Sequence, residues 1–284
     1  MKLVSGKDML EKARAEGYAV GAFSAHNAEM IQAILRAAEE EKAPVMIQVG
    51  QRVIRYMGME AMADMIESFG RHSGATVAIH LDHGNSFEQA MQAVQLRFQS
   101  VMYDGSHLPL EQNIANTKKV AEAAHAVGIS VEGELGRIGG TEDDITVRDE
   151  EAFLTDPEEA VRFVEETGVD SLAVAVGTAH GFYKGTPKLH FARLEQIRDA
   201  VRVPLVLHGG SGVPDDMIRR AISLGIAKVN VDTELRHAFA EAAQAVWREN
   251  PGEYHLSVVL GVAREAVTRK VAEKIRLFGS SGKA

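Results

Sequence analysis

Eight short runs of apolar and β-branched residues recur along the chain, and each is followed by a longer segment whose apolar residues repeat with helical spacing. Met30, Ile34 and Ala37 are one example of that spacing. This alternation predicts parallel strands joined by helices. Eight such units can close into a barrel, so we predict an α/β fold of the (β/α)8 TIM-barrel type. The predicted strands cover residues 18–23, 45–49, 76–81, 100–103, 130–134, 171–176, 205–208 and 228–231.

An open, doubly wound sheet is the competing architecture. Its glycine-rich phosphate-binding turn would follow the first strand, where residues 23–27 instead read Phe-Ser-Ala-His-Asn. The missing turn favours the barrel.

No linker or low-complexity tract divides the sequence, so we expect one domain over residues 1–284. A helical extension is predicted at about 253–278, beyond the last β/α unit. One of its faces is expected to cover the barrel or an oligomer interface, and this face contains Val258, Val262, Ala266 and Val267.

Net charge and the lack of cysteine limit the possible partners and ligands. With 31 basic and 40 acidic residues the formal charge is −9 at pH 7, so we expect neither nucleic acid nor an anionic membrane as a partner. The absence of cysteine leaves His, Asp and Glu as metal ligands. No apolar run has the length of a signal peptide or the roughly 18 residues of a membrane span, so a cytoplasmic location is expected.

Polar side chains follow six successive predicted strands, at the end where β/α barrels place their chemistry. Each alone is explained by a helix N-cap or a hydrogen-bonded structural histidine. Together they predict one site, because three imidazoles at one rim are costly unless something binds them. Three neutral histidines with an open fourth position form a catalytic zinc arrangement, which also accepts cobalt, iron or manganese. The residues are Asp82, His83, Asp104, Glu134, His180, His208, Asn230 and Asp232.

The remaining histidines lack this convergence. His26 and most of the others are expected to be structural or on the surface. For His107, three residues after Asp104, both a place near the site and a surface position stay open.

Glycine-rich loops after the seventh and eighth predicted strands favour a phosphorylated substrate. Barrel enzymes hold phosphate on backbone N–H groups of these loops, and glycine allows close approach. The segment 177–181 and Lys184 can supply further donors. The loop 136–154 is too long for a plain turn, and a mobile lid is preferred over a solvated acidic loop. The phosphate-binding candidates are Gly181, Lys184, Gly209, Gly210, Ser211, Asn230, Val231, Asp232 and Thr233.

These motifs resemble those of the class II fructose-bisphosphate and tagatose-bisphosphate aldolases, in the shorter branch of that family. The resemblance runs nearly end to end and is most specific at residues 81–83, 104–107, 132–136, 139–144, 178–181, 207–211 and 230–234. It implies zinc on His83, His180 and His208, with Asp104 and Glu134 as an alternative or secondary metal site. A monovalent cation (Na⁺ or K⁺) near the phosphate loops and a homodimer or homotetramer are further family features.

The resemblance also implies the reaction. A ketose 1-phosphate, most simply fructose 1,6-bisphosphate, is cleaved reversibly to dihydroxyacetone phosphate and an aldehyde such as glyceraldehyde 3-phosphate. Asp82 matches the acid/base at the aldehyde oxygen, and Glu142 on the lid matches the carboxylate that transfers a proton at the dihydroxyacetone phosphate carbon. These are expectations for a sugar-phosphate lyase of carbohydrate metabolism.

Other readings of the same residues are weaker. A Schiff-base aldolase needs a buried lysine near the carboxyl end of a strand, whereas Lys228 lies at the entry end of the eighth run. A metal-dependent barrel hydrolase would carry a His-x-His pair on its first strand, and the run 18–23 contains no histidine. A non-catalytic sugar-phosphate binding protein would have no need of Asp82, Glu142 and three histidines together.

The distal half of the substrate is where the chain departs from the family. Asp232 and Arg236 match positions that favour fructose 1,6-bisphosphate, but the usual Asn and Ser or Thr are replaced by Ser24 and Gly50. Arg52 is a new cation near these gaps, and an arginine binds phosphate, sulfonate or carboxylate. The alternatives are therefore tagatose 1,6-bisphosphate or a ketose 1-phosphate with another anion, such as 6-deoxy-6-sulfofructose 1-phosphate.

Overall fold

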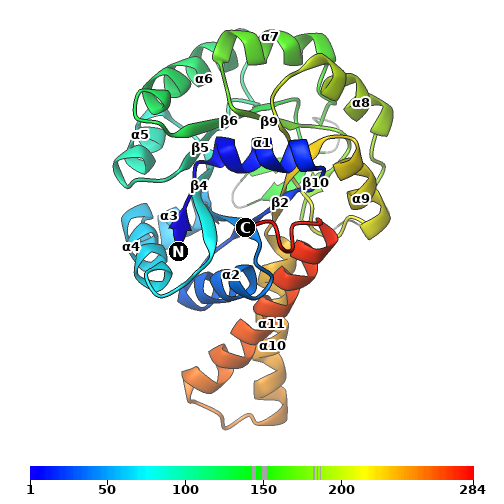
Figure 1. The fold of residues 1–284 in the computed structure, drawn as a ribbon. Helices are drawn as coiled ribbons and strands as arrows, with labels where there is room; N and C mark the ends of the chain where they lie inside the picture. The colour runs from blue at the N-terminus through cyan, green and yellow to red at the C-terminus, as the bar shows by residue number, and fades with distance from the viewer. Residues whose placement is uncertain (143–144, 149–151, 182, 184, 186) are drawn as a thin grey trace.

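The computed structural model describes residues 1–284 except 143–144, 149–151, 182, 184 and 186. Within the described residues, eight parallel strands close on themselves (Figure 1), which confirms the predicted (β/α)8 TIM barrel. β1 (Lys2–Leu3) adds a short pairing at the start of the third barrel strand. Around the barrel the strands are β2 (Val20–Ser24), β3 (Pro44–Val49), β4 (Thr76–Gly84), β5 (Ser100–Tyr103), β6 (Ser130–Leu135), β9 (Ser171–Val174), β11 (Leu205–Leu207) and β12 (Ile226–Val231), which pairs again with β2.

Helices surround the barrel (Figure 1). In the part of the chain that the structure describes, none has the length and apolar composition that crossing a membrane requires. The first helix, α1 (Gly6–Glu16), precedes β2, and the last two, α10 (Thr233–Glu249) and α11 (Leu256–Leu277), follow β12. The others lie between strands: α2 (Ala28–Glu40), α3 (Gln51–Met57), α4 (Met59–Gly70), α5 (Phe87–Gln95), α6 (Leu110–His125), α7 (Pro157–Thr167), α8 (Phe191–Ala200) and α9 (Asp215–Ser223).

Capping side chains fix where several helices begin. The Asn27 side chain accepts a hydrogen bond from the Met30 N–H at 2.9 Å, and Ser86 accepts one from the Gln89 N–H at 3.2 Å. Asp156 caps α7 in the same way. Each cap stabilises its helix by about 1 kcal/mol. As a result, α2 and α5 start within a few residues of the strands β2 and β4, and the connecting loops are short.

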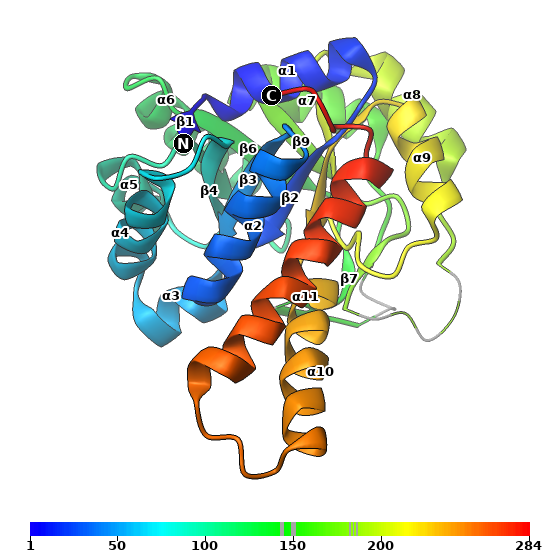
Figure 2. The same ribbon diagram turned by 60° about the horizontal axis from the view of Figure 1, so that its bottom comes forward.

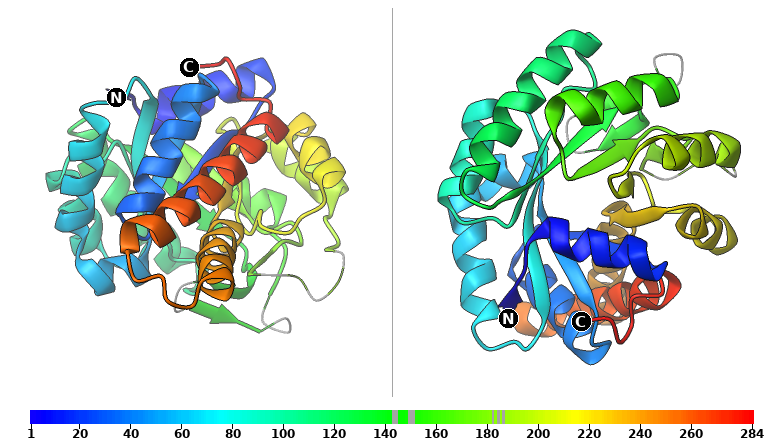
Figure 3. Two further views of the ribbon diagram at one scale, coloured as in Figure 1. Left: turned by 90° about the horizontal axis from the view of Figure 1, so that it is seen from below. Right: turned by 45° about the horizontal axis from the view of Figure 1, so that its top comes forward.

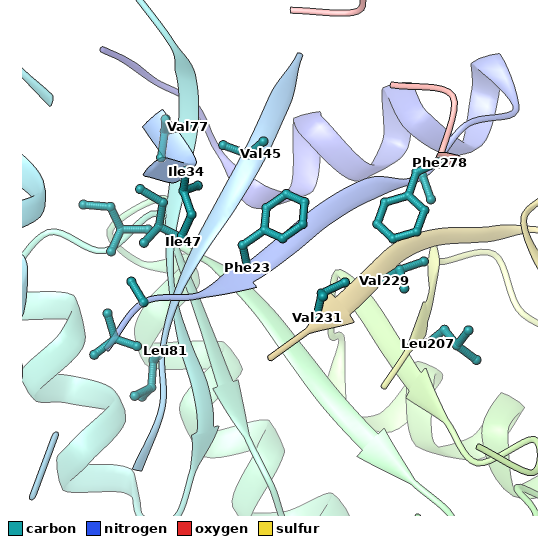
Figure 4. Close-up of a cluster of buried hydrophobic side chains, with 14 of the residues drawn as sticks. Phe23, Ile34, Val45, Ile47, Val77, Leu81, Leu207, Val229, Val231 and Phe278 are labelled. Carbon is teal, nitrogen blue, oxygen red and sulfur yellow. The ribbon is translucent and has the colours of Figure 1, made fainter. Parts of the chain in front are cut away.

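The pleat of β4 separates two environments. Val77, Ile79 and Leu81 are buried in the core between strands and helices, whereas His80 and Asp82 lie on the opposite, inward side. Figure 4 shows this outer core, in which Val77 and Leu81 lie among buried side chains of α2, β2, β3 and β12. Burial of each such aliphatic side chain stabilises the fold by roughly 1.5–3 kcal/mol. The apolar surface therefore holds the barrel together and leaves its interior for polar groups.

Helix α1 covers the end of the barrel at which the strands begin (Figure 1). Gly6 packs directly on Ser100 and Ser130, the first residues of β5 and β6, and a side chain at this position would collide with them. Met9 and Leu10 join an apolar cluster with residues of β2, β3 and β4. This end is closed, so the carboxyl ends of the strands are the accessible mouth.

Helices α10 and α11 form a hairpin that projects beyond the barrel (Figures 2 and 3). The predicted helical extension is present, but its predicted face is divided, because Val258 and Val262 are exposed in the single chain whereas Val267 is buried. The buried row contains Val259, Ala263 and Val267, which pack toward α10 and α2. Adjacent helix positions differ by about 100°, so two neighbouring apolar rows existed, and spacing alone did not identify the buried one.

A second, three-stranded sheet lies beside the barrel mouth. β7 (Gly139–Glu142) pairs antiparallel with β8 (Ile145–Val147) and parallel with β10 (Ala179–His180). A bridge between Arg137 and Phe153 closes its base. The described part of the predicted lid is therefore a hairpin attached to the strand that carries His180.

Candidate metal and substrate site

Strand β4 is interrupted where two predicted site residues lie. Its pairing with β5 shifts register between Leu81 and Gly84, so Asp82 and His83 form a bulge. His83 has a φ of 46°, a left-handed conformation that residues with a Cβ rarely adopt. Bulges and backbone strain of this kind redirect side chains at functional sites. Here they bring both buried side chains to the barrel mouth.

Three histidines surround one point at this mouth. The ring centroid of His83 is 5.4 Å from that of His180 and 4.8 Å from that of His208, and the other two are 6.0 Å apart. One ring nitrogen of each lies within 4.8 Å of the others, so a single ion can contact all three. The structure thus brings together the three histidines singled out in the sequence, from β4, β10 and the end of β11.

Two carboxylates border the histidines. Asp104 Oδ2 lies 2.7 Å from His83 Nδ1, and Glu134 Oε2 lies 3.2 Å from His208 Nδ1. His83, Asp104 and Glu134 also form a second group with metal-binding separations. Burial raises the pKa of Asp104, but hydrogen bonds from His83 and Ser106 outweigh it and hold this pKa well below its usual range. The mouth of the barrel is therefore negatively charged next to the imidazoles.

Unsatisfied polar atoms in this cluster fit a metal ion. Among the described residues, His208 Nδ1 and Glu134 Oε2 are buried without a well-aligned hydrogen-bond partner. Leaving such atoms unpaired costs roughly 1–3 kcal/mol each, and a cation removes that cost. Burial lowers the pKa of His208, but Glu132 and Glu134 raise it to about 9, so the surrounding carboxylates favour positive charge here. The donor set of imidazole and carboxylate groups suits zinc and related divalent ions.

Asp82 is fixed by two amide side chains. Gln48 Nε2 donates to Asp82 Oδ1 at 2.8 Å, and Asn230 Nδ2 donates to the same oxygen at 3.3 Å. Ser24 Oγ donates in turn to Gln48 Oε1 at 3.4 Å. These residues come from β2, β3, β4 and β12, and all are buried. Asp82 is therefore a preorganised carboxylate beside the histidine cluster.

The two glycine-rich segments adjoin each other. Gly210 N donates to Asn230 O at 3.2 Å, which joins the loop after β11 to the end of β12. Tyr183 donates its hydroxyl to Gly209 O at 2.9 Å and accepts a hydrogen bond from the Ala179 N–H at 2.8 Å. Burial raises the pKa of Tyr183 to about 12, so its hydroxyl stays neutral and keeps donating. The loops after β10, β11 and β12 thus form one connected wall.

Helix α10 begins at this wall. Its Glu234 N donates to Ser211 Oγ at 3.3 Å, and Gly212 N donates to Glu234 Oε1 at 2.6 Å. Lys274 of α11 lies 2.8 Å from the same carboxylate oxygen, so the extension helix braces the loop. The phosphate-binding candidates Gly209, Gly210, Ser211, Asn230, Val231, Asp232 and Thr233 lie on these adjoining segments, next to the N-terminus of α10.

Two glycines hold the short strand that carries His180. Gly140 and Gly209 both have positive φ, and a Cβ on either would collide with the backbone of Ala179 or His180. Gly181, another predicted contact, follows directly with a φ of 91°. The close approach of three backbone segments therefore explains part of the glycine content of these motifs.

The distal candidates lie around β2, α3 and α10. Gly50 precedes the first residue of α3, and Arg52 is exposed in its first turn. Arg236 Nε donates to Asp232 Oδ2 at 2.8 Å. His26 Nε2 lies 2.7 Å from the other oxygen of Asp232, so this histidine, expected to be structural or on the surface, is a hydrogen-bonded neighbour of a candidate site residue. The contact arises because β2 and β12 pair, so the loops after them meet.

Three further predicted residues need separate mention. Glu142 ends β7, and its side chain lies outside the described part of the structure, as does the whole of Lys184. His107, left open in the sequence, is exposed.

Comparison with known proteins identifies the family. The model of the family Fructose-bisphosphate aldolase class-II matches residues 4–283. The chain belongs to this family. It is 56% identical over 284 residues to a sulfofructosephosphate aldolase of Alkalicoccus urumqiensis, covering 100% of this chain and 99% of the relative. A fructose-bisphosphate aldolase of Geobacillus stearothermophilus is 48% identical, with 100% and 99% coverage. The crystal structure of the YdjI aldolase from Escherichia coli K12 superposes with a TM-score of 0.87 at 40% identity, covering 99% of each chain.

Two residues next to the candidate site were missed in the sequence. Gln48 contacts Asp82, and its signal was a lone amide in the otherwise apolar run 45–49. His26 contacts Asp232, and its signal was its position directly after the first strand. Both positions follow the rule applied to the other strands, that polar residues at carboxyl ends face the site.

Proposed function

We propose that this aldolase is metal-dependent and reversibly cleaves a ketose 1-phosphate to dihydroxyacetone phosphate and a three-carbon aldehyde. The convergence of His83, His180 and His208 beside Asp82 carries the proposal. The three histidines would hold the ion, zinc by preference, with Co²⁺, Mn²⁺ or Fe²⁺ as replacements. When bound, such an ion stabilises the negative charge that develops on the substrate oxygens during C–C cleavage. Asp104 and Glu134 would form its alternative position.

Proton transfers fall to two carboxylates. Asp82 takes the proton from the C4 hydroxyl as the C3–C4 bond breaks, and the electron pair of that bond remains on C3. Glu142 then supplies a proton to C3, which completes dihydroxyacetone phosphate. The amides of Gln48 and Asn230 support the first step, because their hydrogen bonds hold one oxygen of Asp82 in a fixed orientation.

The 1-phosphate would bind at the connected wall of glycine-rich loops. Backbone N–H groups of 209–211 and 230–233 and the N-terminus of α10 favour an anion there. Gly181 and Lys184 would add donors, with a Na⁺ or K⁺ ion near the phosphate. The barrel and its helical extension would act as one domain.

For the distal group we propose a sulfonate, so that 6-deoxy-6-sulfofructose 1-phosphate is the preferred substrate and fructose 1,6-bisphosphate the second candidate. A relative named sulfofructosephosphate aldolase shares 56% of its residues with this chain. Electrostatics support the choice, because Asp232 lies 2.8 Å from Arg236 and offsets its charge. A sulfonate carries one negative charge, whereas a phosphate monoester carries about 1.5–2 at pH 7. A weakly positive subsite suits the smaller charge.

We predict that Arg236→Ala and Arg52→Ala each lower kcat/KM for the sulfonate substrate. The fall should correspond to a loss of about 1.5–3 kcal/mol in transition-state binding free energy. The measurement compares 6-deoxy-6-sulfofructose 1-phosphate, fructose 1,6-bisphosphate and fructose 1-phosphate, which has no distal anion. Arg55→Ala on the same helix as Arg52 is the charge-matched control. A higher kcat/KM for fructose 1,6-bisphosphate than for the sulfonate would reject the sulfonate assignment. Unchanged values in both arginine variants would reject their role.

A homodimer or homotetramer is the proposed assembly, with the tip of the α10–α11 hairpin as its contact. Leu256, Val258 and Val262 are exposed on the first turns of α11, and together they leave more apolar surface there than a solvent-facing helix needs. We predict that Val262→Asp lowers the molar mass in light scattering toward that of one chain. Val127→Asp, at an exposed position after α6, is the control. A monomeric wild-type protein, or an unchanged mass in Val262→Asp, would contradict this contact.

A further inference from the structure

A charged cluster is enclosed in the barrel directly below His208. Glu132 of β6, Lys228 of β12 and His80 of β4 are at most 1% exposed. Lys228 Nζ lies 2.8 and 3.0 Å from the two carboxylate oxygens of Glu132 and 3.3 Å from His80 Nε2. Glu132 Oε1 lies 3.0 Å from His208 Nε2. The proposed reaction assigns no role to Glu132, Lys228 or His80.

Stability alone does not account for this cluster. Taking two charges out of water costs several kcal/mol per ion, and well-packed apolar residues of similar volume are often equally or more stabilising. The lower end of the same barrel interior is filled in that way, by the apolar cluster that includes Met9 and Leu10. An ion pair placed against His208 therefore calls for another explanation.

Hydrogen-bond directions through the cluster are fixed by its chemistry. Lysine has only donors, so Lys228 donates to both oxygens of Glu132 and to His80 Nε2. His80 Nδ1 then carries the proton and donates to Ser100 Oγ at 2.8 Å. The carboxylate of Glu132 has only acceptors, so the contact with His208 requires a proton on Nε2 of that ring.

Metal binding requires a neutral imidazole, and in the neutral ring a proton on Nε2 leaves Nδ1 of His208 with the lone pair. Nδ1 is the atom that faces the site, 3.2 Å from Glu134 Oε2. A histidine binds a metal through its unprotonated nitrogen, and the partner of the other nitrogen sets which tautomer is present. Glu132 thus selects the tautomer that exposes a lone pair at the mouth, and Lys228 orients Glu132 through two contacts.

We propose that Glu132 and Lys228 are positioning residues that hold His208 as an Nδ1 metal ligand and so set the metal affinity of the site. The proposal rests on the proposed metal-dependent function. Neither residue touches the substrate; both act through His208.

The zinc affinity of the protein and the tautomer of His208 are the two measurements that test this proposal. Glu132→Gln keeps the size of the side chain, but its amide can donate to Nε2 and so stabilise the opposite tautomer. We expect metal-free Glu132→Gln to stay folded by circular dichroism and to bind zinc about 10–100-fold more weakly in competition with a chromophoric chelator. In ¹⁵N spectra of the metal-free protein, recorded at a pH above the His208 pKa of about 9 so that the ring is neutral, His208 should change from the Nε2–H form to a mixture of tautomers. Glu165→Gln, on the exposed side of α7, is the matched control.

The double variant Glu132→Gln/Lys228→Met separates positioning from folding. It removes both charges, so no unpaired ion stays buried. If Glu132 and Lys228 act by positioning His208, the double variant should have a thermal stability close to that of the wild type. Its zinc affinity should still be about 10–100-fold lower. Wild-type zinc affinity in either variant would overturn the proposal. If the wild-type protein binds no zinc, the proposed function fails, while the tautomer comparison still decides whether Glu132 controls His208.

Discussion

Asp82→Ala is expected to lower kcat for C–C cleavage by about 10²–10⁴-fold, the usual contribution of a positioned acid or base. The C4 hydroxyl proton would lose its acceptor, while the histidine cluster and the phosphate loops would remain in place. Asp82→Asn tests the same loss with nearly the same volume. Activity within threefold of wild type in both variants would show that Asp82 is only a structural partner of Gln48 and Asn230.

Hydrogen exchange with solvent at C3 of dihydroxyacetone phosphate distinguishes the proposed role of Asp82 from that of Glu142. Solvent exchange at C3 of dihydroxyacetone phosphate needs no aldehyde and no C–C bond, so Asp82→Ala should retain it. Glu142→Ala should slow both this exchange and cleavage, as measured by loss of the C3 proton signal in deuterated buffer. Exchange at the wild-type rate in Glu142→Ala would assign that residue to the surface of the β7–β8 hairpin instead.

His208→Ala is expected to lose both metal and activity. His208 is fully buried, and its removal takes one of three imidazoles from the cluster and leaves Glu134 without its neighbour. We predict a bound-zinc content near zero after gel filtration and a fall in kcat/KM of at least about 10³-fold, because a bound metal supplies several kcal/mol of charge stabilisation. His190→Ala, outside the cluster and exposed, should retain full zinc content. Unchanged activity in His208→Ala would contradict the assigned ligand set.

Much of the fold followed from pattern, and the particular residues explain why. The apolar run 76–81 marked the third strand, because Val77, Ile79 and Leu81 face the outer core, and the polar residues Asp82 and His83 after it marked its carboxyl end. The histidines at 83, 180 and 208 could be grouped because a parallel barrel brings all carboxyl ends to one rim. The predicted barrel topology therefore showed which residues, although far apart in the sequence, lie close together in space.

Other features depended on information that a linear pattern does not contain. The contact between His26 and Asp232 requires the closure of β12 on β2, which neither segment reveals alone. The ion pair of Lys228 with Glu132 joins β12 and β6, which β11 and β9 separate in the barrel, so the sequence alone showed Lys228 only as a residue at the entry end of a strand. The buried row of α11 depended on where α10 and α2 meet it.

The most direct measurement of the metal-dependent mechanism is release of dihydroxyacetone phosphate by the purified wild-type protein, with and without exhaustive chelation. We predict release from the sulfonate or bisphosphate ketose 1-phosphate, loss of this activity on chelation, and recovery on addition of Zn²⁺ in proportion to metal bound. Full cleavage by the chelated protein, together with a borohydride-reduced substrate adduct on a lysine, would contradict the account.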